Sequence, residues 1–327
     1  MYIETYKFSL WADFIERDFL ENKFKDLLNK KIINGATSNP AIFKQSILTS
    51  EAYKEQIKSL GDIGAKQKYE AIAIKDITKA ADILLPLYEA GDDGFVSIEV
   101  DPFLCDNADA TIEEGKRLFK TINRPNVMIK VPATTAGYKA MQELVSSGIH
   151  VNATLIFKEE QAKECLSAFE AGQNRTSANV HTVISVFVSR IDRALDEKLN
   201  EVGITPSLSG IYNAASIYNM VEALHVKNNR TLFASTGVKG DTLQSAYYID
   251  ELIGKNCVNT APIETIDAFV LKGNRELALP LDEQLIKEHF LKIAAAKIDY
   301  DEVLNNQVKD GLDAFKVAFN EILTALK

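Results

Sequence analysis

Three ionisable residues stand in otherwise apolar segments of the sequence. Asp13 ends the segment FSLWAD, Glu99 lies in VSIEV and Lys130 lies in VMIKVPA. A lysine held among apolar neighbours loses its proton more readily and can then attack a carbonyl carbon to form a Schiff base. The imine withdraws electrons from the neighbouring carbon–carbon bond, and two separated carboxylates can carry the protons that this chemistry requires. Lys130 is therefore the predicted nucleophile, and Asp13 and Glu99 are the predicted acids and bases.

Several uncharged polar residues and two cations complete the set. Asn39, Asn152 and Thr154 are suited to holding substrate hydroxyls or a catalytic water. Arg190 follows the run SVFVS at an expected helix start, where the helix dipole and a bidentate guanidinium both favour an anion. The loop STGVKGD adds backbone donors and Lys239, although such a loop is equally typical of a simple turn. We therefore expect the substrate to carry a phosphate.

The elements that would position these residues alternate along the chain. Eight short apolar runs are predicted strands: Phe8–Asp13, Gly35–Ser38, Val96–Val100, Val127–Val131, Val151–Phe157, Thr182–Val188, Arg230–Ser235 and Cys257–Ala261. The segments between them have helical spacing, as in Tyr138–Ser146, Glu159–Ala171, Ile191–Asn200 and Thr242–Gly254.

Eight such repeats without a hydrophilic linker predict one (β/α)8 barrel over residues 1–327. The alternative is an open doubly wound sheet, but the chain lacks the GxGxxG after its first strand that would favour it. Residues 44–87 and 281–327 exceed a minimal barrel and are expected to be helical elaborations packed on its outside.

Alternation along the predicted strands indicates which residues share a face. In five strands one face is apolar and carries Leu10, Ala12, Val96, Ile98, Val100, Val127, Ile129, Val131, Val151, Ala153, Leu155, Ile184, Val186 and Val188. The opposite face carries Ser9, Trp11, Asp13, Ser97, Glu99, Lys130, Asn152, Thr154, Ser185 and Phe187. Taken singly, Lys130 or Glu99 could be a solvated residue at a strand end. Together these residues predict a shared site inside the barrel, because an unpaired buried charge is costly.

Composition limits the partners and the location of the protein. Its 327 residues include 37 Lys and Arg against 46 Asp and Glu, a net charge of −9 that argues against nucleic acid or an anionic membrane as partner. No apolar run is long enough to span a membrane, and the charged N-terminus leaves no room for a signal peptide. Three widely spaced cysteines favour a reducing cytoplasm. No metal site is expected, because the histidines form no HxH or HExxH pair.

Taken together, these segments resemble the transaldolase family along nearly the whole barrel. The motifs that carry the resemblance are WAD (11–13), GATSNPAIF (35–43), VSIEVDP (96–102), MIKVPAT (128–134), VNATLIF (151–157), SVFVSRID (185–192) and FASTGVK (233–239). The resemblance implies a (β/α)8 barrel without metal or organic cofactor. It also implies transfer of a dihydroxyacetone unit from sedoheptulose 7-phosphate to glyceraldehyde 3-phosphate, giving erythrose 4-phosphate and fructose 6-phosphate, in the non-oxidative pentose phosphate pathway. Family members are often homodimers.

The resemblance implies a role for each candidate residue. Lys130 would be the Schiff-base lysine, and Asp13 the acid and base at the C4 hydroxyl. Glu99 and Thr154 would hold and activate the water of imine formation and hydrolysis. The substrate would be bound by Asn39 and Asn152 at the dihydroxyacetone hydroxyls, by Ser185 and Arg190 at the phosphate, and by Phe187 as a wall of the pocket.

The chain departs from the family pattern after Ser235. Other branches place an arginine shortly after this serine, where the chain reads Ser235-Thr236-Gly237-Val238-Lys239. We expect Ser235 to bind substrate and Lys239 to supply the second charge at the phosphate.

Two other functions stay open. A fructose-6-phosphate aldolase shares the lysine but releases dihydroxyacetone to water, and such relatives are shorter and usually have an amide in place of Glu99. A catalytically silent sugar-phosphate binding barrel would lack Lys130, Asp13 or Glu99, whereas this chain has all three.

Overall fold

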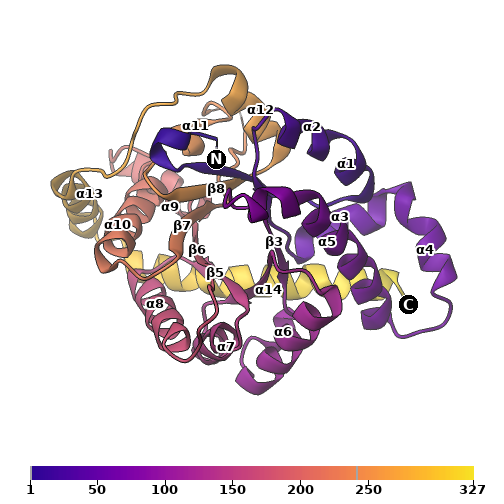
Figure 1. The fold of residues 1–327 in the computed structure, drawn as a ribbon. Coiled ribbons are helices and arrows are strands. Elements are labelled where there is room, and N and C mark those ends of the chain that lie inside the picture. The colour runs from indigo at the N-terminus through magenta and orange to yellow at the C-terminus, as the bar shows by residue number, and fades with distance from the viewer. Residues whose placement is uncertain (1, 241) are drawn as a thin grey trace.

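The eight apolar runs each form a strand, and the strands close into a parallel barrel in chain order (Figure 1). The computed structural model describes residues 2–240 and 242–327. The strands are β1 (Ser9–Ala12), β2 (Gly35–Ala36), β3 (Phe95–Glu99), β4 (Val127–Pro132), β5 (His150–Ile156), β6 (Thr182–Phe187), β7 (Asn229–Ala234) and β8 (Cys257–Ala261). This topology confirms the predicted (β/α)8 barrel and excludes the open doubly wound sheet.

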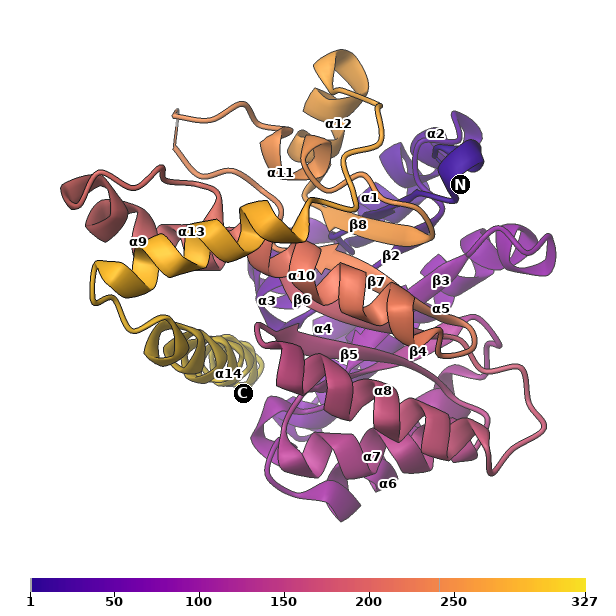
Figure 2. The same ribbon diagram turned by 90° about the vertical axis from the view of Figure 1, so that its left-hand side faces the viewer.

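Helices follow the strands and surround the barrel (Figures 1 and 2). They are α1 (Arg17–Glu21), α2 (Lys23–Asn29), α3 (Pro40–Thr49), α4 (Lys54–Ser59), α5 (Ala65–Glu89), α6 (Ala108–Ile122), α7 (Thr135–Ser146), α8 (Glu159–Gln173), α9 (Ser189–Glu201), α10 (Ser209–Leu224), α11 (Tyr247–Asp250), α12 (Ile263–Lys272), α13 (Glu283–Ala295) and α14 (Tyr300–Ala325). Short 3-10 helices occur at η1 (Glu4–Tyr6), η2 (Glu51–Tyr53) and η3 (Pro102–Leu104).

The helix expected over Thr242–Gly254 was predicted too long. Only Tyr247–Asp250 is helical. Beyond this turn the Ile253 carbonyl accepts hydrogen bonds from the backbone N–H groups of Ala278 and Leu279, so the chain pairs with a distant loop instead of continuing the helix.

The predicted alternation of faces is confirmed for most strand residues. Val127, Ile129 and Val131 pack in the large apolar cluster that includes the surrounding helices. Trp11, Met128 and residues of the same parity from four other strands form a second cluster, which fills the interior of the barrel. Strand pairing places Lys130 opposite Glu99 on β3 and Asn152 on β5, so these three residues lie at one level of the barrel.

Leu155 is an exception, and its predicted orientation was wrong. Its φ is +59°, and the pairing of β5 with β6 shifts between Ala153 and Ile156. This irregularity inserts one residue, so Ile156 rather than Leu155 packs in the outer cluster. Leu155 instead contacts α14, where it lies next to Gly311.

The C-terminal elaboration does more than pack on the outside. Helix α14 contacts α3, α9, η3 and β5, all of which border the carboxyl ends of the strands. Figure 1 shows α14 crossing this end of the barrel from one side to the other. The helix therefore forms a cover over the carboxyl ends of the strands, which is the end where (β/α)8 barrels carry their functional sites.

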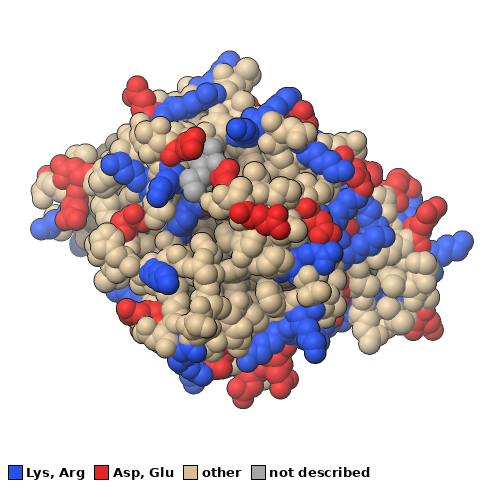
Figure 3. Space-filling model, in the orientation of Figure 1, with Lys and Arg blue, Asp and Glu red and all other residues tan. Residues whose placement is uncertain are grey.

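The face of the molecule in Figure 3 carries charges of both signs. Lys and Arg side chains are interspersed with Asp and Glu side chains on the face that Figure 3 shows. In the described part of the chain, no helix combines the length and the apolar character that crossing a membrane requires.

Candidate active site

Lys130 lies inside the barrel under α14 and is only 5% exposed. Its Nζ donates a hydrogen bond to the Ser38 carbonyl oxygen at 3.1 Å and lies 3.6 Å from Glu99 Oε2. The ring of Phe315, on α14, has its centroid 6.0 Å from the same nitrogen. The amine therefore has a carboxylate beside it and an aromatic wall next to it, in a site that largely excludes bulk water.

Glu99 and Thr154 flank β4 with unused hydrogen-bonding capacity. Both carboxylate oxygens of Glu99 and the Thr154 hydroxyl are buried and have no hydrogen-bond partner in the described chain. Burial raises the pKa of Glu99 to about 7, while Lys130 opposes this rise and the Asp13 charge adds to it. Buried polar atoms without partners are rare in proteins, so these atoms mark a place for water or substrate.

Asp13 follows β1 on another side of the barrel mouth. Its Oδ1 accepts a hydrogen bond from Thr37 Oγ1 at 2.7 Å, and Thr37 in turn lies 2.7 Å from the Thr260 hydroxyl. Burial raises the pKa of Asp13, while the Lys130 charge and the Thr37 hydrogen bond oppose the rise. The structure thus brings together the three ionisable residues that the sequence predicted, from β1, β3 and β4.

A chain of hydrogen bonds joins polar side chains of β6, β5 and β3 in the barrel interior. Ser185 Oγ donates to Asn152 Oδ1 at 2.6 Å, and Asn152 Nδ2 donates to Ser97 Oγ at 3.0 Å. Asn39 lies at the start of α3, where its Oδ1 caps the helix by accepting from Ile42 N–H at 3.0 Å. Its Nδ2 group has no partner among the described residues. Ser185 lies against Asn152 in the barrel interior. The amide groups of Asn152 and Asn39 are of the kind that binds substrate hydroxyls.

The predicted phosphate end lies where α9 begins. Arg190 stacks on Phe187, with its Cζ 5.2 Å from the ring centroid, and makes no hydrogen bond or ion pair to a described residue. Phe187 packs against Phe157 at 5.3 Å between centroids. The hydroxyls of Ser189 and Ser235 lie 3.1 Å apart beside the start of this helix. Lys239, in contrast, is exposed and has no contact of this kind to a described residue.

Comparison with known proteins identifies the family. The family described as "Transaldolase/Fructose-6-phosphate aldolase" matches residues 10–326. The chain belongs to this family. A transaldolase of Campylobacter jejuni subsp. doylei is 46% identical over 330 residues, which cover 98% of this chain and 99% of the relative. A Helicobacter pylori transaldolase is 44% identical over 320 residues, with the same two coverages. The resemblance inferred from the motifs is confirmed.

The sequence analysis missed two residues that contact the site of this transaldolase-family chain. Thr37, which orients Asp13, lies in the TSNP motif and continues β2, so its position in the motif was a usable signal. Phe315 carried no such signal, because a phenylalanine on a helix is ordinarily a core residue.

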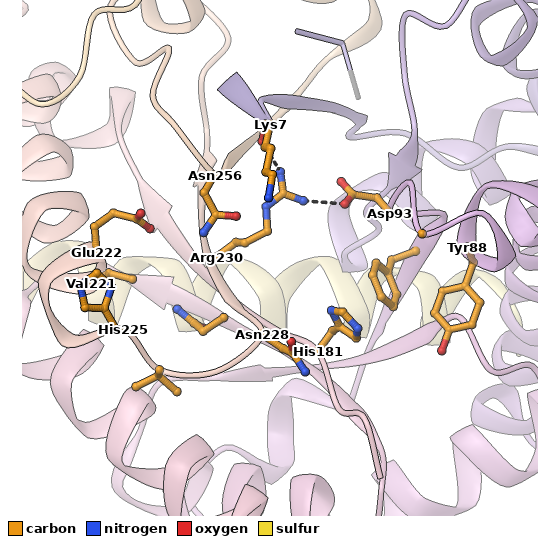
Figure 4. A pocket seen from close by; sticks show the side chains of 14 residues that line it. Lys7, Tyr88, Asp93, His181, Val221, Glu222, His225, Asn228, Arg230 and Asn256 are labelled. Atoms are coloured by element: carbon orange, nitrogen blue, oxygen red, sulfur yellow. Dashed lines mark hydrogen bonds and ion pairs between the residues drawn. The ribbon is translucent and has the colours of Figure 1, made fainter. Parts of the chain in front are cut away.

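A separate cavity of about 510 Å³ opens at the opposite end of the barrel (Figure 4). Lys7, His181, Arg230 and Asn256 line it, and all four precede or begin strands. Arg230 Nη1 pairs there with Asp93 Oδ1 at 2.6 Å. None of the predicted site residues lies in this cavity. Across the described residues, no group of three or more His, Cys, Asp or Glu side chains could hold a metal ion.

Proposed function

We propose that the chain is a transaldolase that moves a dihydroxyacetone unit between sugar phosphates through a Schiff base on Lys130. The observation that carries the proposal is the buried Lys130 amine, whose Nζ lies 3.6 Å from a Glu99 carboxylate that has no hydrogen-bond donor among the described residues. Asp13 lies on another side of the same barrel mouth. The full-length similarity to proteins named transaldolase supports the transfer reaction.

The first half of the reaction forms the imine. Neutral Lys130 Nζ attacks the ketone carbon C2 of the donor sugar, giving a carbinolamine. Loss of its hydroxyl group as water requires a proton, which Glu99 can supply because its pKa of about 7 leaves part of the carboxyl protonated at neutral pH. A water held by Glu99 and Thr154 would serve this step and its reversal, in accord with their unpartnered buried oxygens.

The second half breaks and remakes the carbon–carbon bond. Asp13 takes the proton of the C4 hydroxyl, the C3–C4 bond breaks, and its electron pair moves through C2 to the imine nitrogen. The aldehyde leaves, and the three-carbon enamine stays on Lys130 until an acceptor aldehyde enters. C3 then attacks the acceptor carbonyl, and Asp13 returns the proton to the new hydroxyl. Thr37 would hold Asp13 for both transfers, in accord with its 2.7 Å hydrogen bond.

The remaining residues would bind the substrate. Asn152 is suited to the hydroxyls of the three-carbon unit, because it lies at the level of Lys130 on the neighbouring strand. Asn39, which follows Ser38 at the start of α3, is suited to the same hydroxyls. Ser185, which the resemblance assigned to the phosphate, donates its hydrogen bond to Asn152 and would support Asn152 at these hydroxyls instead. Arg190 has five donors, none of which finds an acceptor among the described residues, and would bind the phosphate with Ser235. The Phe187 ring stacks against the Arg190 guanidinium and would form the wall between the hydroxyl-binding and phosphate-binding ends of the site.

The aldolase alternative differs only in the fate of the enamine. An aldolase protonates it and releases dihydroxyacetone to water, whereas a transaldolase keeps it for an acceptor. The cover that α14 forms over Lys130 favours transfer, since it restricts the access of water to the intermediate. A silent binding barrel would have no need for the buried pair Lys130 and Glu99 with a third ionisable group, Asp13, at the same barrel mouth.

A product assay separates these functions. We would supply fructose 6-phosphate alone and with erythrose 4-phosphate, and measure sedoheptulose 7-phosphate, glyceraldehyde 3-phosphate and free dihydroxyacetone. A transaldolase forms sedoheptulose 7-phosphate only with the acceptor and releases little dihydroxyacetone. Rapid release of dihydroxyacetone without acceptor would establish the aldolase. If no product forms, the silent binding barrel is the remaining function. Lys130→Met is the matched inactive control.

We also propose that the enzyme is cytoplasmic and that it acts as a homodimer. All three cysteines, Cys105, Cys165 and Cys257, are buried and free, in accord with a reducing compartment. Sedimentation analysis of the purified protein would test the dimer.

A further inference from the structure

We infer that Arg193, rather than Lys239, supplies the second cation that binds the substrate phosphate in this chain. The inference rests on the proposed function, and it assigns to α9 a charge that other branches of the family place after β7. Three observations support it: the contacts of Arg193, the absence of a carboxylate within ion-pair distance among the described residues, and the course of the loop after Ser235.

Arg193 is held at the two serines that mark the phosphate end. It lies three residues after Arg190 on α9, so the two guanidinium groups share one face of the first helical turns. Arg193 Nη1 donates a hydrogen bond to Ser189 Oγ at 3.1 Å. Ser189 Oγ is 3.1 Å from Ser235 Oγ, and Ser189 N–H donates to the Ser235 carbonyl at 3.0 Å. These contacts join Arg193 to β7 as well as to its own helix.

Two like charges meet here without a bound carboxylate. No carboxylate of a described residue lies within ion-pair distance of Arg190 or Arg193, although most other arginines in the described chain have one. Burial and the Arg193 charge both lower the pKa of Arg190, with Asp310 opposing, and burial lowers the pKa of Arg193, with Tyr248 and Asp192 opposing. The repulsion occurs at a helix N-terminus, which adds a partial positive charge. An anion seated between the two arginines would relieve it.

The loop after Ser235 cannot supply the second charge from the positions nearest the serine. Thr236 is buried and donates its hydroxyl hydrogen bond toward β8, to Asn259 Oδ1 at 2.8 Å and to the Thr260 carbonyl at 3.0 Å. Gly237 has no side chain, and a Cβ there would lie 3.1 Å from Pro262. Lys239 is the first cation in this loop; it is exposed, as Arg193 is, but it makes no hydrogen bond or ion pair to a described residue. The backbone therefore turns toward β8 after Ser235, and Arg193 on α9 is the cation nearest that serine by its contacts.

The test measures phosphate recognition separately from the chemistry at Lys130. Initial rates with fructose 6-phosphate and erythrose 4-phosphate would be compared for wild type, Arg193→Ala, Arg193→Gln, Arg193→Lys and Lys239→Ala. We expect Arg193→Ala and Arg193→Gln to raise the KM for both sugar phosphates about 10- to 100-fold, the usual effect of losing a charged hydrogen bond. Arg193→Lys should recover much of the loss because it keeps the charge, and Lys239→Ala should change KM less than twofold.

Two further measurements distinguish binding from folding. Inorganic phosphate should inhibit the wild type competitively and should inhibit Arg193→Gln at least ten times more weakly. Arg193→Gln can still donate a hydrogen bond toward Ser189, so a purely structural role for Arg193 would leave this variant close to wild type. Lys198→Ala, at an exposed charge five residues further along α9, is the matched control and should match the wild type in both assays.

The possible outcomes are separable from failure of the proposed function. Trapping of unphosphorylated dihydroxyacetone on Lys130 by borohydride needs no phosphate site, so it should be equal in wild type and Arg193→Gln. A wild type that neither traps dihydroxyacetone nor transfers it would overturn the proposed function. Normal transfer with an unchanged KM and unchanged phosphate inhibition in Arg193→Gln would overturn the role of Arg193 alone. A larger loss in Lys239→Ala than in Arg193→Ala would return the second charge to Lys239.

Discussion

Replacing Glu99 by glutamine should stabilise the folded protein at alkaline pH while impairing imine formation. Glu99 is 6% exposed and both of its oxygens lack hydrogen-bond donors, so its ionised form is poorly solvated in the native state. Burial raises its native pKa from the ordinary 4.5 to about 7, with Lys130 opposing the rise. Glutamine has nearly the same shape and cannot ionise. The substitution therefore removes the cost of the buried charge.

The sign and size of the effect follow from proton linkage. Below pH 4.5 Glu99 is protonated in both the native and the unfolded state, and its ionisation does not affect stability. Between 4.5 and about 7 only the unfolded state ionises, so the free energy of unfolding falls as pH rises. The interval of about 2.5, at about 1.4 kcal/mol for each pKa unit, amounts to about 3 kcal/mol. Above pH 7 the penalty is constant.

Urea unfolding at pH 5 and pH 8.5 measures this difference directly. Trp11 is the single tryptophan and is fully buried, so its fluorescence reports loss of the barrel interior. We expect the stability of Glu99→Gln relative to wild type to increase by about 2.5 kcal/mol between the two pH values, because the unfolded state is already partly ionised at pH 5. The control is Glu143→Gln, at a surface ion pair with Arg175, whose relative stability should be the same at both. An equal effect of Glu99→Gln at pH 5 and pH 8.5 would refute the buried-charge reasoning.

Three further substitutions test other parts of the structure. Asp13→Asn should still allow borohydride trapping on Lys130 but slow transfer by roughly 10²–10⁴-fold, because the C4 hydroxyl loses its base; loss of trapping would contradict this division of roles. Phe315→Ala should increase the release of free dihydroxyacetone relative to transfer, because water gains access to the enamine, and an unchanged product ratio would show that α14 does not shield the site. Arg230→Leu should lower the free energy of unfolding by about 3–5 kcal/mol, because it leaves Asp93 buried without its ion pair. Burial on its own raises the pKa of Asp93, but Arg230, Ser9 and Trp11 outweigh this effect and together lower the pKa. In urea titrations, the loss of stability in Arg230→Leu should therefore shrink as acid protonates the Asp93 carboxyl. A pH-independent loss would contradict that explanation.

Local patterns in the sequence were sufficient to predict the barrel and the level at which its ionisable residues meet. The period of two along each strand is a property of the backbone, so Glu99, Lys130 and Asn152 could be assigned to one face before their pairing was known. The number of strands followed from the same runs.

Features that depend on long-range contacts could not be predicted in this way. The irregularity at Leu155 is a single left-handed residue in an otherwise regular strand, and the side chain that it redirects contacts α14, about 150 residues later in the sequence. The position of α14 over the barrel end is likewise a tertiary packing choice. Arg193 resembles any polar residue on a surface helix in sequence, and only its hydrogen bond to Ser189 places it at the proposed phosphate end.

The central claim is that Lys130 forms a covalent imine with the donor sugar. Fructose 6-phosphate and borohydride should be added to the wild type and to Lys130→Met, followed by mass spectrometry of the intact protein and of its peptides. The account predicts one reduced three-carbon adduct on the wild-type peptide that contains Lys130, and none on the variant. An adduct on another lysine, or full transfer activity in Lys130→Met, would contradict it.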